Sequence, residues 1–182
     1  MEGISGIVLA GGKSTRMGRD KASLPFRDGT LLTVQRDKLT ALGITDILLS
    51  GYRDGMIPDD TPDCGPLGGL AACLGRAKHP CALVLSVDVP LVPLDSLQKL
   101  IAAHTGGATL LQHGERIEPL IAVYDTAFSA KAQALLRSGR RAVRSLLDGS
   151  EWRTVSVPDD ELLYANCNTP EAYETALRRA KS

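Results

Sequence analysis

Small residues and cations gather near the N-terminus in the segment "LAGGKSTRMGRDK" (9–21), which directly follows the apolar run "GIVLA". Two adjacent glycines, Gly11 and Gly12, would let backbone N–H groups approach a ligand without a Cβ in the way. Arg16 and Lys21 add cationic donors that can clamp a polyphosphate. A basic turn in solvent is the alternative. The position after a first strand, where α/β sheets bind ligands, favours phosphate binding.

The centre of this segment looks like the end of a Walker P-loop but does not have its spacing. A P-loop needs a glycine, four residues, and then Gly-Lys-Ser/Thr. Gly12-Lys13-Ser14 supplies the end, but Ile7 occupies the position of the first glycine. The dinucleotide fingerprint G-x-G-x-x-G also fails, because Gly11 and Gly12 are adjacent and the next glycine is Gly18. The segment is therefore not a Walker loop.

A single carboxylate, Asp88, ends the apolar run "CALVLSVD" (81–88). It should lie at the same edge of the sheet as the glycine pair, since the carboxyl ends of parallel strands meet there. Mg²⁺ suits such a place, because it takes few carboxylates and relies on substrate phosphates and waters. Taken alone, the D-x-P sequence would equally fit an aspartate that caps a helix or forms a turn.

The chain around these residues alternates strand-like and helix-like runs. We expect strands at 5–10, 44–51, 81–88, 107–112, 117–125 and 152–158. We expect helices at 31–43, 65–78 (a loop entering a helix), 92–104, 126–138, 140–148 and 168–181. This alternation is typical of an α/β fold. It predicts a three-layer sandwich, with a mostly parallel central sheet and helices on both faces, in a single domain, 1–182.

The composition bounds the class of protein. Lys and Arg together number 21, as do Asp and Glu, and a zero net charge argues against nucleic-acid binding. No run approaches the ~20 apolar residues of a membrane span, and the first residues lack the basic start of a secretory signal. The four cysteines form no C-x-x-C pair. We therefore expect a cytoplasmic protein that is a monomer or weak oligomer and binds neither nucleic acid nor membrane.

The segment 9–21 resembles the L-A-G-G-x-x-x-R-M-G-x-D-K signature of nucleotidyltransferases that activate a phosphorylated substrate with an NTP. Along its whole length the chain looks most like the molybdenum cofactor guanylyltransferases. Further segments correspond to that family in order: "GPLGGL" (65–70), "VDVPLV" (87–92), "HGERIEPLIAVY" (113–124), "GRRAVRSLL" (139–147) and "NCNTPEAY" (166–173). The resemblance implies a Rossmann-like fold. It also implies transfer of GMP from Mg-GTP to the terminal phosphate of molybdopterin, with release of pyrophosphate.

The same resemblance implies which residues do the work. Arg16, Lys21 and Asp88 would be catalytic, with Asp88 as the Mg²⁺ ligand. The nucleotide and the molybdenum cofactor would be bound by Leu9, Ala10, Gly11, Gly12, Lys21, Asp63, Gly65, Pro66, Asp88, Glu115, Arg116, Asn166 and Asn168. Two of these motifs also have plainer interpretations. "HGER" fits the polar tip of a hairpin between two strands, and Asn168 or Thr169 fits a helix cap.

Recognition of the base would fall to Asp63, since a carboxylate only accepts hydrogen bonds and suits the donor edge of guanine. The segment is one residue shorter than the D-x-P-G-P-L of the family, and Asp59 and Asp60 lie nearby. "SGYR" (50–53) stands where the family tends to have an Asn-rich turn. Both departures bear on which base is selected.

Other activities remain open at this stage. A close relative would use CTP on molybdopterin, or would use a sugar or polyol phosphate with another base. A GTP-binding module without turnover belongs to a different class, and intact Lys21 and Asp88 argue against it. The partners implied are GTP and molybdopterin, with molybdenum insertion and chaperone proteins downstream.

Overall fold

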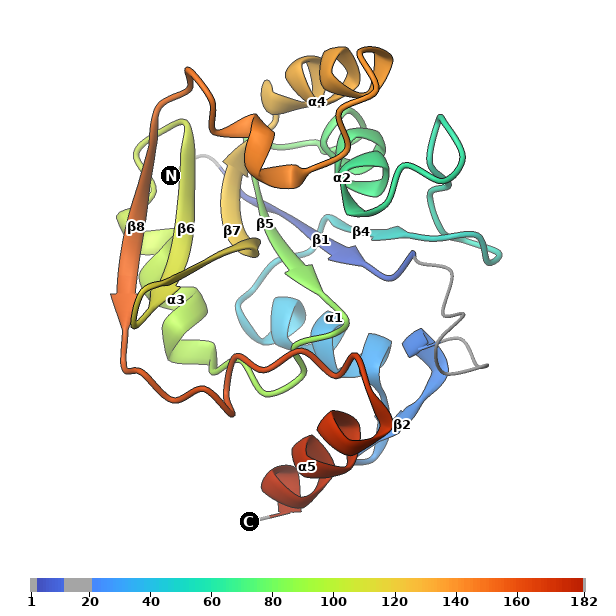
Figure 1. Ribbon diagram of the computed structural model, residues 1–182, viewed down its shortest axis with the longest axis vertical. Helices are drawn as coiled ribbons and strands as arrows, with labels where there is room; N and C mark the ends of the chain where they lie inside the picture. The colour runs from blue at the N-terminus through green and yellow to red at the C-terminus, as the bar shows by residue number, and fades with distance from the viewer. Residues whose placement is uncertain (1–2, 12–20, 182) are drawn as a thin grey trace.

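The computed structural model describes residues 3–11 and 21–181. Its centre is a sheet in the order β4-β1-β5-β7-β6-β8 (Figure 1). In that order the strands are β4 (Ile47–Ser50), β1 (Ser5–Leu9), β5 (Cys81–Ser86), β7 (Arg116–Asp125), β6 (Ala108–His113) and β8 (Trp152–Val157). β7 runs antiparallel to both of its neighbours, and the other pairings of this sheet are parallel.

Helices cover both faces of the sheet (Figure 1). One face packs against α1 (Leu31–Ala41), α3 (Leu94–Ala103) and α5 (Pro170–Lys181). The other packs against α2 (Pro66–Leu74), α4 (Phe128–Arg137) and the short 3₁₀ helix η2 (Val143–Leu146). Each face has its own apolar core, so the predicted three-layer α/β sandwich is confirmed.

The apolar composition of the central strands accounts for their position in the sheet. Every residue of β1 and of β5 is buried, as expected of apolar strands in a parallel sheet covered on both faces. In the register, Leu9 lies opposite both Ser50 of β4 and Ser86 of β5. The carboxyl ends of these three strands therefore emerge at one level, which is the edge where α/β folds bind ligands.

Local structure departs from the sequence expectations in several places. α2 ends at Leu74, short of the predicted limit of 78, and β4 begins at Ile47 and not at 44. The expected helix 140–148 forms only the single 3₁₀ turn η2. The chain entering α1 contains the 3₁₀ helix η1 (Lys21–Ser23) and a two-stranded ribbon of β2 (Pro25–Phe26) and β3 (Gly29–Thr30), which the sequence did not predict. α1 begins with a capping box between Thr30 and Thr33 and ends at Ala41, two residues before the predicted limit. Among the described residues, no helix is both long and apolar enough to span a membrane.

At the amino edge of the sheet, side chains form hydrogen bonds with one another and with the main chain. The two ring nitrogens of His104 lie 3.1 Å from Thr109 Oγ1 and 3.0 Å from Asp125 Oδ1. The other oxygen of Asp125 accepts the N–H of Gly107 at 2.6 Å. Gly107 has a φ of +72°, and a Cβ there would overlap the carbonyl oxygen of Glu151.

We expect Gly107→Ala to destabilise the fold more than Gly139→Ala. Both glycines have positive φ, which costs an L-residue about 1–2 kcal/mol, but a Cβ on Gly139 would have nothing within 4 Å. The clash at Gly107 should reduce the free energy of unfolding by a further ~1–3 kcal/mol. Urea denaturation of the two variants measures the difference, and equal losses would contradict this account of the amino edge.

Candidate active site

The candidate site lies where β1, β4 and β5 end. The N–H of Ala10 donates to the carbonyl of Ser50 at 3.1 Å, which joins the residues following β1 to β4. Leu9 is buried in the core, so only its main chain reaches this edge, where its carbonyl accepts the N–H of Val87 at 3.2 Å. Gly11 is exposed, and a Cβ there would touch Ser50 Oγ at 3.6 Å. Its lack of a side chain keeps the main chain at this edge accessible.

Lys21, Asp88 and Asn168 meet at this edge although they are far apart in the sequence. Lys21 Nζ lies 3.1 Å from Asp88 Oδ1 and donates to Asn168 Oδ1 at 2.6 Å. Both charged side chains remain partly accessible, 17% for Lys21 and 27% for Asp88. The cluster thus presents an ammonium group, a carboxylate and an amide together, which suits a polyanionic ligand with a divalent cation. Gly12 and Arg16, two other predicted site residues, lie outside the described residues.

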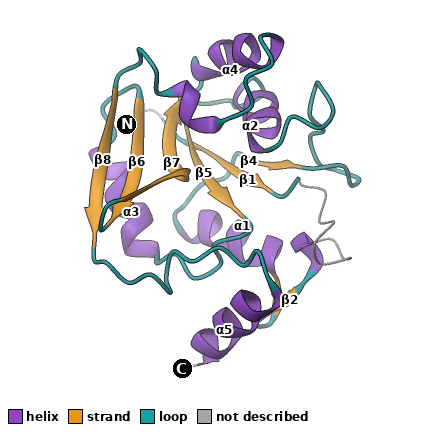
Figure 2. Cartoon of the chain, in the orientation of Figure 1, coloured by secondary structure: helices purple, strands orange, loops and turns teal. Residues whose placement is uncertain are grey.

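The segment between β8 and α5 passes the carboxyl end of β5 (Figure 2). The N–H of Cys167 donates to the carbonyl of Asp88 at 2.8 Å. Burial, together with the nearby Asp88 carboxylate, raises the pKa of the Cys167 thiol to about 11, so it remains protonated at neutral pH. Cys167 is therefore a packing residue, and the exposed Asn166 and Asn168 on either side of it face solvent at the site.

Asn168 and Thr169 make different contacts. Thr169 Oγ1 accepts the N–H of Ala172 at 3.2 Å and so caps the start of α5. The Asn168 side chain instead contacts Lys21 at the site.

A divalent cation would find the carboxylate of Asp88 here. Among the described residues, no group of three or more His, Cys, Asp or Glu side chains that could hold a metal ion gathers at one point. Asp88 is an accessible carboxylate with Lys21 on its Oδ1. That donor set fits Mg²⁺, which is commonly held by one or two carboxylates while substrate phosphates and waters fill the other positions.

The start of α2 forms the second part of the site. Gly65 precedes the helix with a φ of +63°, and Pro66 is its first residue. Asp63 also has a positive φ, +60°, and its side chain is exposed. Its carbonyl accepts a hydrogen bond from Arg141 Nη1 at 3.0 Å, which anchors the loop to the segment before η2.

Asp59, one of the acids near Asp63 in the sequence, packs against the start of α2. A Cβ on Gly68 would lie 2.7 Å from Asp59 Oδ2, so the bare helix leaves room for this carboxylate. Burial raises the pKa of Asp59, a hydrogen bond from Tyr52 opposes the shift, and the charges of Asp60 and Asp63 add to it. The available signal was the Gly-Gly pair of "GPLGGL", which removes side chains from one face of the helix.

Glu115 and Arg116 form the exposed tip of the β6–β7 hairpin, as the plainer interpretation of "HGER" predicts. Because β6 runs in the same direction as β5, this tip lies at the carboxyl edge of the sheet. His113 lies beneath it, almost fully buried, with its ring stacked on Tyr164 at 4.7 Å between centroids. This stacking joins the hairpin to the segment that carries Asn166 and Asn168.

A family model, the MobA-like NTP transferase domain, matches residues 6–155, which includes the ends of β1, β4 and β5 and the start of α2. The chain belongs to this family. Relatives named molybdenum cofactor guanylyltransferase include one from Xanthomonas euvesicatoria, 34% identical over 95% of this chain and 94% of that protein. Another, from Ectopseudomonas mendocina, is 31% identical over 93% and 90%.

A solved structure extends the comparison to the fold. Molybdopterin-guanine dinucleotide biosynthesis protein A from Archaeoglobus fulgidus superimposes with a TM-score of 0.77 at 20% identity. The match covers 98% of this chain and 99% of the other, so the two share one fold along almost their full lengths.

We expect Asp59→Asn to stabilise the protein at neutral pH. Since the folded-state pKa of Asp59 is raised, its ionised form is disfavoured in the fold, and this cost appears as the pH rises through that pKa. The variant should melt about 1–3 °C above the wild type at pH 7, and the difference should narrow towards pH 4. Thermal melts across this range measure it; a difference that does not change with pH would contradict the assignment.

Proposed function

We propose that this chain transfers GMP from Mg-GTP to the terminal phosphate of molybdopterin and releases pyrophosphate, forming the molybdopterin guanine dinucleotide cofactor. The observation that carries the proposal is the meeting of Lys21, Asp88 and Asn168 at the carboxyl edge of the sheet, in a chain of the MobA-like NTP transferase family. Relatives covering almost the whole chain bear the name of this activity.

The reaction needs no protein base. The attacking group is a phosphate oxygen, which is already anionic, and it displaces pyrophosphate from the α-phosphorus of GTP. Catalysis then rests on in-line positioning and on neutralising charge that spreads over the phosphates. Mg²⁺, when bound, supplies part of that neutralisation.

Each side chain has a role in this scheme. The main chain at Ala10, Gly11 and Gly12 would approach the nucleotide, and Arg16 and Lys21 would hold its phosphates. The Asp88 carboxylate would hold Mg²⁺. The ammonium group of Lys21 would turn from Asp88 Oδ1 and Asn168 Oδ1 towards the polyphosphate.

The other residues would position the two substrates. Asp63 would accept from the donor edge of guanine, with Gly65 and Pro66 shaping the loop beneath the base. Molybdopterin would be contacted by Glu115 and Arg116 at the hairpin tip and by Asn166 and Asn168 before α5. Both segments lie at the same sheet edge as Asp88. We place this enzyme in the cytoplasm.

Lys21→Ala should lower the turnover number by ~100-fold or more, because it removes a cation from the charge that develops at the phosphates. The fold should survive, since an accessible ion pair contributes little to stability. Measuring pyrophosphate release together with the melting temperature separates the two effects. Lys99→Ala is the matched control, because Lys99 is an exposed lysine of α3 paired with Asp95. Near-normal transfer by Lys21→Ala would overturn the role given to this residue.

Base selection is tested by offering equimolar GTP, CTP and UTP with Mg²⁺ and molybdopterin. The product should contain GMP, and Asp63→Asn should reduce the preference for GTP about tenfold or more, since a charged acceptor is lost. Asp54→Asn, an exposed acid in the preceding loop, is the control. A product containing CMP would identify a cytidylyltransferase instead. Nucleotide binding without any release of pyrophosphate would identify a non-catalytic module.

A further inference from the structure

The turn that carries Asp88 is held through its main chain. The N–H of Asp88 donates to Ser86 Oγ at 3.2 Å, and its carbonyl accepts from Cys167. The carbonyls of Ser86 and Val89, on either side of Asp88, point away from this edge towards α1. Each carbonyl accepts one long hydrogen bond from the main chain of the turn, Ser86 O from the N–H of Val89 at 3.5 Å and Val89 O from the N–H of Val92 at 3.4 Å. Because buried carbonyls need good partners, the shorter hydrogen bonds that α1 offers them help to fix the path of the turn.

Gln35 of α1 satisfies both carbonyls. Its side chain is fully buried, and its Nε2 donates to Ser86 O at 2.7 Å and to Val89 O at 2.9 Å. The orientation of the amide is determined, because two carbonyl oxygens can only accept. One amide group therefore bridges the two sides of Asp88.

The same amide leaves its oxygen, Oε1, buried without a hydrogen-bond partner among the described residues. Such a group costs free energy, and a native structure that keeps one calls for an explanation. A methionine or leucine would fill a similar volume without a buried oxygen. The two donated hydrogen bonds explain why the position holds an amide.

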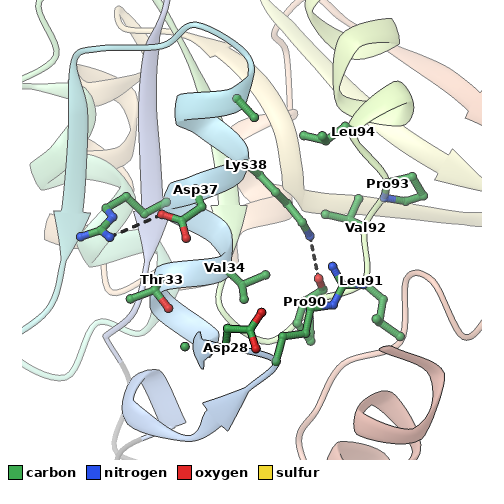
Figure 3. Close-up of a pocket in the computed structure, with 14 residues that line it drawn as sticks. Asp28, Thr33, Val34, Asp37, Lys38, Pro90, Leu91, Val92, Pro93 and Leu94 are labelled. Atoms are coloured by element: carbon green, nitrogen blue, oxygen red, sulfur yellow. Dashed lines mark hydrogen bonds and ion pairs between the residues drawn. The ribbon is translucent and has the colours of Figure 1, made fainter. Parts of the chain in front are cut away.

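Lys38, three residues further along α1, holds the next part of the turn. Its Nζ donates to the carbonyl of Pro90 at 2.6 Å (Figure 3). Burial, with a smaller effect of the Arg27 charge, lowers the pKa of Lys38 to about 7. An ammonium group and a neutral amine both donate, so the contact exists on either side of that pKa.

Between this face of α1 and residues 90–94 lies a cavity of about 620 Å³ (Figure 3). Gln35 lies outside this cavity. Beside it, α1 and the turn share one apolar cluster, in which Leu31 and Leu39 pack with Val87, Val89 and Val92. The hydrogen bonds from Gln35 and Lys38 add a polar connection from the helix to the carbonyls around Asp88.

We propose that Gln35 and Lys38 are positioning residues, which hold the turn 86–90 so that the Asp88 carboxylate faces a divalent cation bound with the nucleotide. This inference rests on the proposed function for the cation and extends it to α1. Outer residues that orient a ligand in this way typically change metal affinity 10–100-fold when they are lost.

The test measures cation binding as well as turnover. Gln35→Met keeps the volume and removes both donors, whereas Lys38→Met removes one donor and Lys38→Arg retains it. Leu39→Val, at a fully buried residue of the same helix that points into the core, is the control for loss of α1 packing. Each variant is titrated with Mn²⁺ in the presence of GTP by calorimetry. The Mg²⁺ concentration that gives half-maximal pyrophosphate release and the melting temperature are also measured.

We expect Gln35→Met to weaken Mn²⁺ binding and raise the Mg²⁺ requirement by about tenfold or more. Lys38→Met should have a smaller effect in the same direction, with Lys38→Arg near wild type and Leu39→Val unchanged in cation binding. Equal effects from Gln35→Met and Leu39→Val would overturn the proposal, because both would then act through stability alone. If Gln35→Met does not fold, unchanged cation binding by folded Lys38→Met overturns it.

The two proposals fail in different ways. A wild-type chain that transfers no GMP, but whose Mn²⁺ binding with GTP is weakened by Gln35→Met and not by Leu39→Val, would refute the proposed reaction and support the positioning role. Transfer of GMP with a cation requirement unaffected by Gln35→Met and Lys38→Met would do the reverse. Absence of Mn²⁺ binding by the wild type with GTP would also overturn the positioning role.

Discussion

The parallel pairing of β1 with β4 on one side and β5 on the other is the constraint on which the site depends. Leu9 lies level with Ser50 and Ser86, so three strands end together and pass into loops at one edge. That alignment brings Gly11, Gly51 and Asp88 to one region. The register is secured by apolar burial on both faces of β1 and β5, and the site is therefore supported by the two cores of the sandwich.

The C-terminal part of the chain supplies the remaining described contacts of the site. Cys167 contacts Asp88, and Asn168 contacts Lys21 across 147 positions of the sequence. The Lys21–Asp88 pair is partly accessible, so solvent screens it and reduces its contribution to stability. The pair matters for the position of its two charges. It keeps an ammonium group and a carboxylate side by side, where a phosphate would bind the ammonium group and a divalent cation would bind the carboxylate. Asn168 supplies a neutral partner that holds the lysine without adding charge.

The sequence predicted those features that short-range patterns determine. The apolar runs of β1 and β5, the helical spacing of α1 and the glycine-rich start of α2 all identified their elements. β2 and β3 have two residues each, too few for any periodicity, and they form because the chain folds back against α1. At 140–148 the sequence suggested a helix, but the chain makes one 3₁₀ turn.

Site residues also differ in whether a short sequence motif identifies them. Asp88 and Lys21 belong to compact motifs, and the structure brings them together. Asp59 has no motif, and its place beside Gly68 depends on how the preceding loop folds over α2. Gln35 had a signal that sequence reasoning did not use. It lies between Leu31 and Leu39 at four-residue spacing, which makes it a polar residue on the buried stripe of a helix.

The two edges of the sheet differ in how well their polar side chains are satisfied. At the carboxyl edge, Asp59 is a carboxylate with a raised pKa, and Gln35 holds a buried oxygen without a described partner. At the amino edge, Thr109, His104 and Asp125 have the residue types of a catalytic triad, and the His104 nitrogens contact both of the others. Thr109 is fully buried, so no substrate can reach its hydroxyl, and these contacts stabilise the sheet. Unmet polar groups point to the carboxyl edge, since proteins tolerate such costs mainly where a ligand makes use of them.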